Sequence, residues 1–221
     1  MGTSAAAIAH CYRVFGGYPL PARLWICPQC APDRSAAELA RTPLRALSFA
    51  DLDAVHVMSL DDDALRHFFP RLIELLLVTP APVFDFRAAD LKARIAGWSA
   101  RERAAVAALA EAVWAELIEA YPAPLGYCSD CPSALELLDW TGLPREPQLD
   151  ELLTSEREAS ARHLADLVDY SFESTCGAEL VEWVSAAAVG VRLQEAFFTA
   201  SSAEAADQLS AAHQLWTLRR A

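Results

Sequence analysis

The sequence lacks any apolar run long enough to cross a membrane. Its continuously apolar stretches, such as Leu75 to Val78, are all short. A membrane-spanning helix needs about 20 apolar residues. The first residues, Met1 to Ala7, have neither the basic residues nor the long apolar core of a secretory signal. A myristoylation signal would have Ser or Thr at position 6, where this chain has Ala6. These absences predict a cytoplasmic protein with no membrane partner.

Basic residues are also scarce. The chain has 18 Lys and Arg against 30 Asp and Glu, which gives a formal net charge of −12. A field of this sign repels nucleic acid and anionic lipid, so we expect no nucleic-acid partner. It favours a basic protein partner, or it serves only solubility.

Familiar catalytic motifs are missing as well: the chain has no glycine-rich dinucleotide loop, P-loop, nucleophile elbow or zincin helix. His163 and Asp166 place an imidazole and a carboxylate three positions apart, on one face of a helix. Because no nucleophile accompanies them, we interpret them as part of an exposed polar face rather than a catalytic dyad. His67 is interpreted in the same way. No catalytic or cofactor-binding residue is assigned.

What the sequence does have is helical periodicity, which predicts an all-α fold in a compact stack of nine or ten helices. Ser35, Ser99 and Ser155 each begin a capping-box pattern, and Ser201 begins a similar one. The carboxylates of Asp61 to Asp63 are expected to complement a helix dipole rather than to hold a metal. Helices are expected at 4–15, after 35, after 48, and at 61–76, 86–96, 100–121, 132–140, 155–170, 177–199 and 201–219.

Two units are predicted. The proline-containing segment from Leu143 to Pro147 is the best candidate for a boundary. Residues 1–149 would form a helical domain that contains the cysteine pairs, and residues 150–221 a C-terminal helical subdomain packed on it.

Four of the six cysteines form two Cys-x-x-Cys pairs, Cys27 with Cys30 and Cys128 with Cys131. Two such pairs on loops match the needs of a tetrahedral, four-thiolate zinc site. The pairs are far apart in the sequence, so only the tertiary fold could close the site. Four thiolates would leave no open position for a catalytic water, so the zinc would be structural. Reduced thiols without metal, and disulfide or redox chemistry, are the alternatives.

The remaining cysteines receive lesser roles. His10 or Cys11 could replace one of the four ligands. Cys176 stands alone and is expected to be a small buried hydrophobe.

Two stretches carry a resemblance. One is the Cys-Pro-Gln-Cys loop at positions 27–30, and the other is Leu-Arg-His-Phe-Phe-Pro-Arg-Leu-Ile-Glu-Leu-Leu at positions 65–76. Together they resemble a group of uncharacterised bacterial all-helical proteins that have a Cys-Pro-x-Cys loop and an Arg-His-Phe-Leu-Pro-Arg-Leu type segment. The resemblance covers about the first half of the chain, up to Trp98. It implies an all-helical fold, and it implies no activity.

The sequence therefore predicts a non-enzymatic protein that binds another protein through an acidic surface, with a structural zinc site. An adaptor, or an immunity-type neutraliser of a basic toxin, would fit this description. The alternative is an enzyme of unknown reaction whose site is assembled from dispersed residues, with His163, Asp166 and the thiols as candidates.

Overall fold

The computed structural model describes residues 3–27, 29, 33–79, 88–173 and 177–220. These residues form twelve α-helices and three short 3-10 helices, and no strand occurs among them. The predicted all-α class is confirmed. The α-helices are α1 (Ser4–Phe15), α2 (Ala36–Arg41), α3 (Phe49–Ala54), α4 (Asp62–Leu76), α5 (Ala88–Ala96), α6 (Ala100–Leu117), α7 (Cys131–Thr141), α8 (Glu146–Thr154), α9 (Glu158–Glu173), α10 (Ala178–Val184), α11 (Ala187–Thr199) and α12 (Ala203–Arg220).

Two of these helices exceed the number expected. The proline-containing segment proposed as a boundary opens α8, because Pro147 stands in the first turn, where its missing N–H is not needed. The single helix expected over 177–199 is divided into α10 and α11 by Ala186, whose backbone is extended. The predicted division at 149/150 falls inside α8 and remains a prediction.

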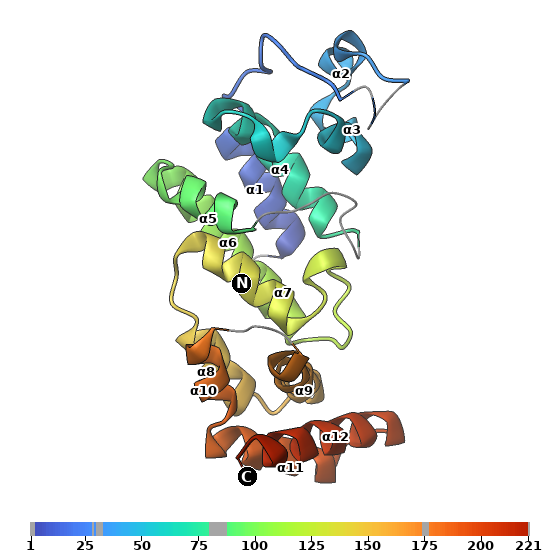
Figure 1. The fold of residues 1–221 in the computed structure, drawn as a ribbon, viewed down its shortest axis with the longest axis vertical. Helices are drawn as coiled ribbons and strands as arrows, with labels where there is room; N and C mark the ends of the chain where they lie inside the picture. The colour runs from blue at the N-terminus through green and yellow to red at the C-terminus, as the bar shows by residue number, and fades with distance from the viewer. Residues whose placement is uncertain (1–2, 28, 30–32, 80–87, 174–176, 221) are drawn as a thin grey trace.

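The helices are stacked along one long axis (Figure 1). Helices α2 and α3 lie at one end, α1 and α4 follow, and α5, α6 and α7 occupy the middle. Helices α8, α9 and α10 come next, and α11 and α12 form the opposite end. Helix α7 packs against α5 and α6 on one side and against α9 on the other. It therefore joins the two halves of the stack.

Local capping explains where several helices begin. Ser35, Ser48 and Ser99 each form a complete capping box with the carboxylate three residues later. The side chain of Asp61 accepts a hydrogen bond from the backbone N–H of Ala64 at 2.9 Å, and two further carboxylates occupy the first turn of α4. The helix-capping interpretation of the three aspartates is confirmed. Pro70 lies inside α4, which continues through it as one helix.

Helix α1 is held against α6 by polar as well as apolar contacts. The backbone N–H and the hydroxyl of Ser4 both donate to the carboxylate of Glu116, at 2.8 and 2.7 Å. The buried thiol of Cys11 lies 3.8 Å from the carbonyl oxygen of Ala105. The first helix of the chain thus packs on one that follows it by about a hundred residues.

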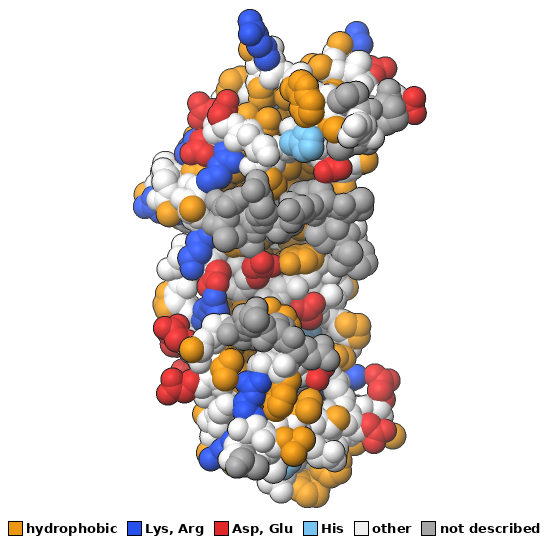
Figure 2. Space-filling view, viewed as in Figure 1, with side chains coloured by type: hydrophobic (Ala, Val, Ile, Leu, Met, Phe, Trp, Pro, Cys, Tyr) orange, Lys and Arg blue, Asp and Glu red, His pale blue; other side chains and the backbone are white. Residues whose placement is uncertain are grey.

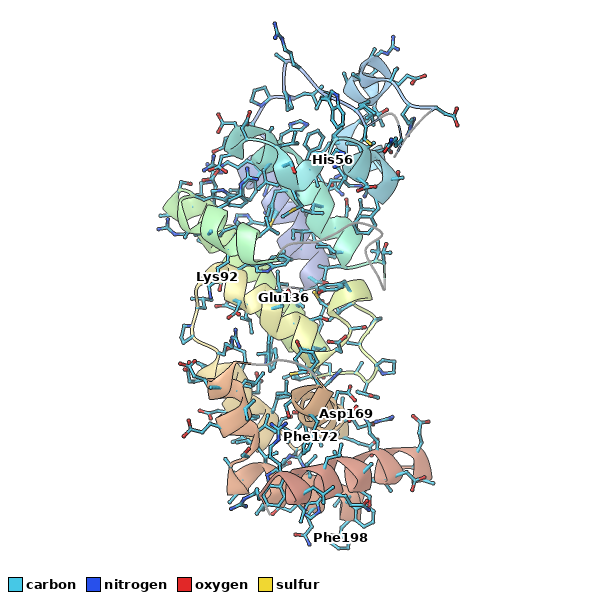
Figure 3. All side chains as sticks on the ribbon, in the orientation of Figure 1. His56, Lys92, Glu136, Asp169, Phe172 and Phe198 are labelled. Carbon is cyan, nitrogen blue, oxygen red and sulfur yellow. The ribbon has the colours of Figure 1, made fainter. Side chains whose placement is uncertain are left out.

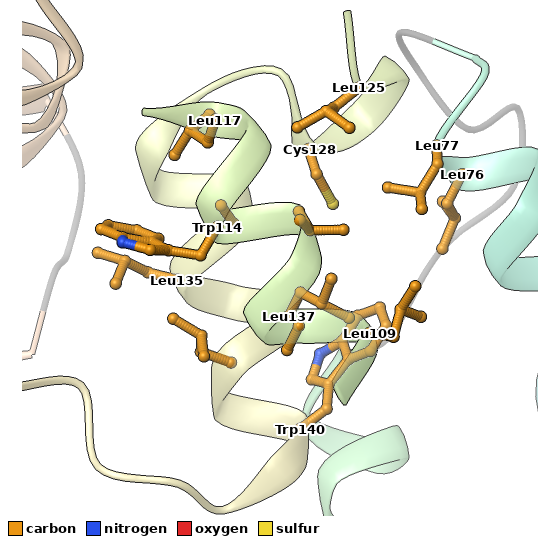
Figure 4. Close-up of a cluster of buried hydrophobic side chains, with 14 of the residues drawn as sticks. Leu76, Leu77, Leu109, Trp114, Leu117, Leu125, Cys128, Leu135, Leu137 and Trp140 are labelled. Atoms are coloured by element: carbon orange, nitrogen blue, oxygen red, sulfur yellow. The ribbon is translucent and has the colours of Figure 1, made fainter. Parts of the chain in front are cut away.

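The core runs through the whole stack, and the pairing of α6 with α7 forms its middle. Trp114 and Trp140 are buried in it, while Trp183 and Trp216 are half-buried against it. Figure 4 shows leucines and tryptophans of the two helices meeting side chains from the end of α4: Leu76, Leu77, Leu109, Trp114, Leu117, Leu135, Leu137 and Trp140.

One close backbone approach depends on glycine. Gly126 opens a 3-10 helix (Gly126–Cys128) with a φ of +56°, in the left-handed region. A Cβ at this position would lie 2.5 Å from the carbonyl oxygen of Leu76, at the end of α4. Glycine alone allows the segment before α7 to lie this close to α4.

No helix in the described ranges is both long and apolar enough to span a bilayer.

Candidate functional site

The residues proposed as an exposed polar face lie in a buried junction between α6, α7, α9 and α12. His163 on α9 is fully buried, so the expectation of an exposed face is wrong for this residue. Its Nε2 lies 3.0 Å from the carbonyl oxygen of Ala120, so Nε2 carries the proton and donates it. Its ring packs against the Tyr121 ring with the centroids 4.9 Å apart. Burial, which disfavours the imidazolium, lowers the pKa of His163.

Asp166 is the polar centre of the same junction. Its Oδ1 accepts hydrogen bonds from the Tyr121 hydroxyl at 3.0 Å and from Gln208 Nε2 at 2.7 Å. Arg162 donates to the Gln208 side-chain oxygen at 2.7 Å and lies over the Tyr121 ring, 4.0 Å from its centroid. Burial raises the pKa of Asp166 to about 6, against the lowering effect of these hydrogen bonds. The network is a structural link between α9 and α12.

This junction offers little to a substrate. His163 and Cys131 are both completely buried. The Nδ1 atom of His163 is buried and finds no hydrogen-bond partner among the described residues. Two hollows between α7 and α10 are lined by other residues. The histidine and the thiol therefore have no visible route to a reacting molecule in this part of the chain.

The cysteines lie in separate surroundings. Cys27 is buried beside α3, where its backbone N–H donates to the Ala54 carbonyl at 2.8 Å. Cys128 and Cys131, before and at the start of α7, are free thiols within the apolar core. Burial raises the pKa of Cys128 to about 12, and burial also raises that of Cys131 well above its usual value. The predicted ligand Cys30 and the isolated Cys176 lie outside the described residues.

The described residues do not support the four-cysteine site. Within the described ranges, no group of three or more His, Cys, Asp or Glu residues could hold a metal ion. Cys27, Cys128 and Cys131 are thus not gathered as a ligand group in this structure. The replacement ligand Cys11 lies against α6 instead. The zinc site remains a prediction, because its fourth ligand is not described.

A concave surface lies between α7 on one side and α8 and α10 on the other. It consists of two adjoining hollows with volumes of about 360 and 630 Å³. Asp139, Arg145, Gly177 and Leu180 line both of them. We call the two hollows together the α7–α10 cleft.

An ion pair stands at the centre of the α7–α10 cleft. The guanidinium of Arg145 binds both carboxylate oxygens of Asp139, with Nε 2.6 Å from Oδ1. Lys92 Nζ lies 4.0 Å from the same carboxylate. In the smaller hollow the Tyr127 hydroxyl donates to Glu136 at 2.6 Å. Glu136 and Lys92 are labelled in Figure 3 at the level of α7.

Sequence reasoning assigned none of the cleft residues, because they come from separate segments, α5, α7, α8, α9 and α10 among them, that only the fold brings together. The nearest sequence signal is the Leu143 to Pro147 segment, which turns the chain from α7 into α8 along the larger hollow. It was interpreted only as a boundary.

The chain matches no family model, no curated protein and no solved structure. The resemblance noted for its first half remains an expectation.

Proposed function

We propose that this protein acts by binding another protein of basic character through an acidic surface, without catalysing a reaction. The observation that carries the proposal is the charge. If every Lys and Arg were paired with a carboxylate, twelve negative charges would still be uncompensated. Such a field accelerates association with a basic partner and makes binding salt-dependent.

The described surface is compatible with this role. The face in Figure 2 carries Asp and Glu side chains over most of its length, interspersed with Lys and Arg. Glu111 on α6 and Glu195 on α11 are exposed, in different layers of the stack. The surplus charge is thus distributed along the molecule, and a partner needs a shaped site to bind at one place.

A lysate experiment tests the proposal. Immobilised protein is exposed to lysate of its own source cells at low ionic strength and then washed with rising salt. We expect a stoichiometric basic protein that dissociates as salt rises, and that binds again when purified. A salt-insensitive partner, or no partner, would contradict the proposal.

The structural zinc is part of the same proposal, and its support is the sequence pattern of two Cys-x-x-Cys pairs. The enzyme alternative would require a substrate to reach His163 or the thiols. Turnover of a defined substrate that His163→Ala abolishes would decide for the enzyme.

A further inference from the structure

The α7–α10 cleft combines carboxylates with aromatic rings in each of its two hollows. We infer that it receives one segment of a partner protein, with one basic side chain in each hollow. The inference rests on the proposed function, because it names the place and the chemistry of partner binding.

The smaller hollow has the chemistry that a cation needs. Glu136 is half-buried, and the one hydrogen bond that its carboxylate accepts among the described residues comes from a neutral hydroxyl, that of Tyr127. No ion pair reaches Glu136 from the described residues. Tyr127 and Tyr170 line the same hollow. A carboxylate beside aromatic rings is a favourable environment for an ammonium or guanidinium group.

The larger hollow repeats this combination with different residues. Glu146 and Glu179 line it, both are exposed, and neither forms an ion pair within the described ranges. Trp183, half-buried, supplies the aromatic ring. Leu149 and Leu180 add apolar surface, on which the aliphatic part of a lysine or arginine side chain can pack.

The centre of the α7–α10 cleft differs from its two ends. Both basic residues of the wall, Arg145 and Lys92, lie beside Asp139. The single carboxylate of Asp139 offsets one of these two positive charges, so the centre is not a place for a cationic side chain. The uncompensated carboxylates are Glu136 at one end and Glu146 and Glu179 at the other. This distribution fits two cationic groups with a neutral stretch between them.

The side-by-side arrangement of the two hollows favours a chain segment over a single small cation. The hollows adjoin through four shared residues and are both open to solvent. A small-molecule site is usually a more enclosed cleft that buries most of its ligand. An extended peptide can instead lie across both hollows and place one side chain in each.

Synthetic peptides test the inference directly. Fluorescent glycine–serine peptides carry two lysines at increasing separation, and matched peptides carry glutamine instead. Binding is followed by fluorescence anisotropy at about 0.15 M salt, where charges more than about 8 Å apart are largely screened. We expect one lysine spacing to bind best. The double variant Glu136→Gln with Glu179→Gln should weaken that binding by about fivefold, as expected for two exposed charge pairs.

A matched control separates the α7–α10 cleft from general acidity. The double variant Glu111→Gln with Glu195→Gln removes the same charge from exposed positions on α6 and α11, and should bind like the wild type. Equal weakening in both double variants, or equal binding of lysine and glutamine peptides, would overturn the inference. A cellular partner captured equally by wild type and cleft variant would overturn it while leaving the proposed function intact. Absence of any salt-sensitive partner would overturn the proposed function itself.

Discussion

Asp166 on α9 accepts a hydrogen bond from the hydroxyl of Tyr121, the residue that follows α6 by a few positions, with a donor–acceptor distance of 3.0 Å. The same carboxylate oxygen accepts a second hydrogen bond from Gln208 of α12. One side chain therefore connects three parts of the chain, and its ionisation is coupled to how these helices pack.

The pKa of Asp166 predicts a pH-dependent stability. Burial raises this pKa from 3.8 to about 6, so the folded state holds the proton more tightly than the unfolded state does. The resulting stability is fully present below about pH 3.8 and is lost as pH rises through about 6. Asp166→Asn keeps the oxygen that accepts both hydrogen bonds. In urea unfolding, we expect the variant to exceed the wild type in stability at pH 7, with the difference disappearing towards pH 4. A difference independent of pH would contradict this.

His163 should act in the opposite direction. Its pKa is lowered from 6.5 because burial disfavours the imidazolium. The stability that depends on neutral imidazole is present above pH 6.5 and is lost as pH falls through the lower folded pKa. His163→Gln can still donate to the Ala120 carbonyl, and should cost about 1 kcal/mol at pH 8 through lost packing on Tyr121. Its stability should then fall less steeply than that of the wild type on acidification. An unchanged slope would show that His163 does not control it.

Two glycines provide a matched pair. Gly126 and Gly142 both have positive φ, +56° and +69°, so an alanine at either costs about 1–2 kcal/mol from the backbone alone. At Gly142 a Cβ would meet nothing within 4 Å, whereas at Gly126 it would lie 2.5 Å from the Leu76 oxygen. Gly126→Ala should therefore destabilise the protein by at least about 2 kcal/mol more than Gly142→Ala, because backbone must move. If thermal unfolding showed the same destabilisation for both variants, the backbone at the end of α4 would be able to move away from the added Cβ at little cost.

The contact between α11 and α12 predicts that one substitution, Gly190→Ala, has opposite effects on stability in two backgrounds. A Cβ on Gly190 would overlap the ring of Trp216, whose Nε1 donates to the Ala186 carbonyl at 3.2 Å. Gly190→Ala should destabilise the wild type by about 1–2 kcal/mol, since overpacking outweighs the gain in helix propensity. In a Trp216→Leu background the same change should stabilise by about 0.5–1 kcal/mol. Additive effects of the two substitutions would mean that the ring moves aside without cost.

The zinc prediction is decided by metal analysis. A four-thiolate site binds one ion, so protein purified without added metal should contain about one zinc per chain. Cys27→Ser and Cys131→Ser should each lose the metal and lower the melting temperature, because structural zinc contributes folding free energy directly. If Cys131→Ser lowers stability while metal content stays at zero, Cys131 is a core thiol and the four-cysteine site does not exist.

Capping-box patterns correctly predicted the helix starts at Ser35 and Ser99, where the serine bonds to the glutamate three residues later. The same pattern was misleading at Ser155. There Glu158, the expected partner, accepts two hydrogen bonds from Ser201, at 2.6 and 2.9 Å. Ser155 ends α8 instead, and α9 begins at Glu158. A distant residue competed for the carboxylate, and no local pattern can reveal that.

The site was harder to predict for the same reason. His163 is buried because the end of α6 supplies a carbonyl and a ring for it, neither of which lies near it in sequence. The break at Ala186 carries no glycine or proline that would indicate it. The α7–α10 cleft depends on how α8 and α10 pack around α7, which no local sequence pattern indicates. Helix content was therefore largely predictable, while the partners of polar side chains were not.

The pairing of α1 with α6 has a consequence for synthesis. Ser4 and Glu116 are 112 positions apart. In the folded protein α1 packs against α4 and against α6, so it is fully covered only when both helices are present. At typical translation rates of about 5–20 residues per second, α1 waits roughly 6–20 s before its partner helix is made. Helix α4 is made sooner and covers part of α1, but the thiol of Cys11, which lies against Ala105 of α6 in the folded protein, is uncovered on that side until then. The nascent chain is thus a candidate client for ribosome-associated chaperones during that interval.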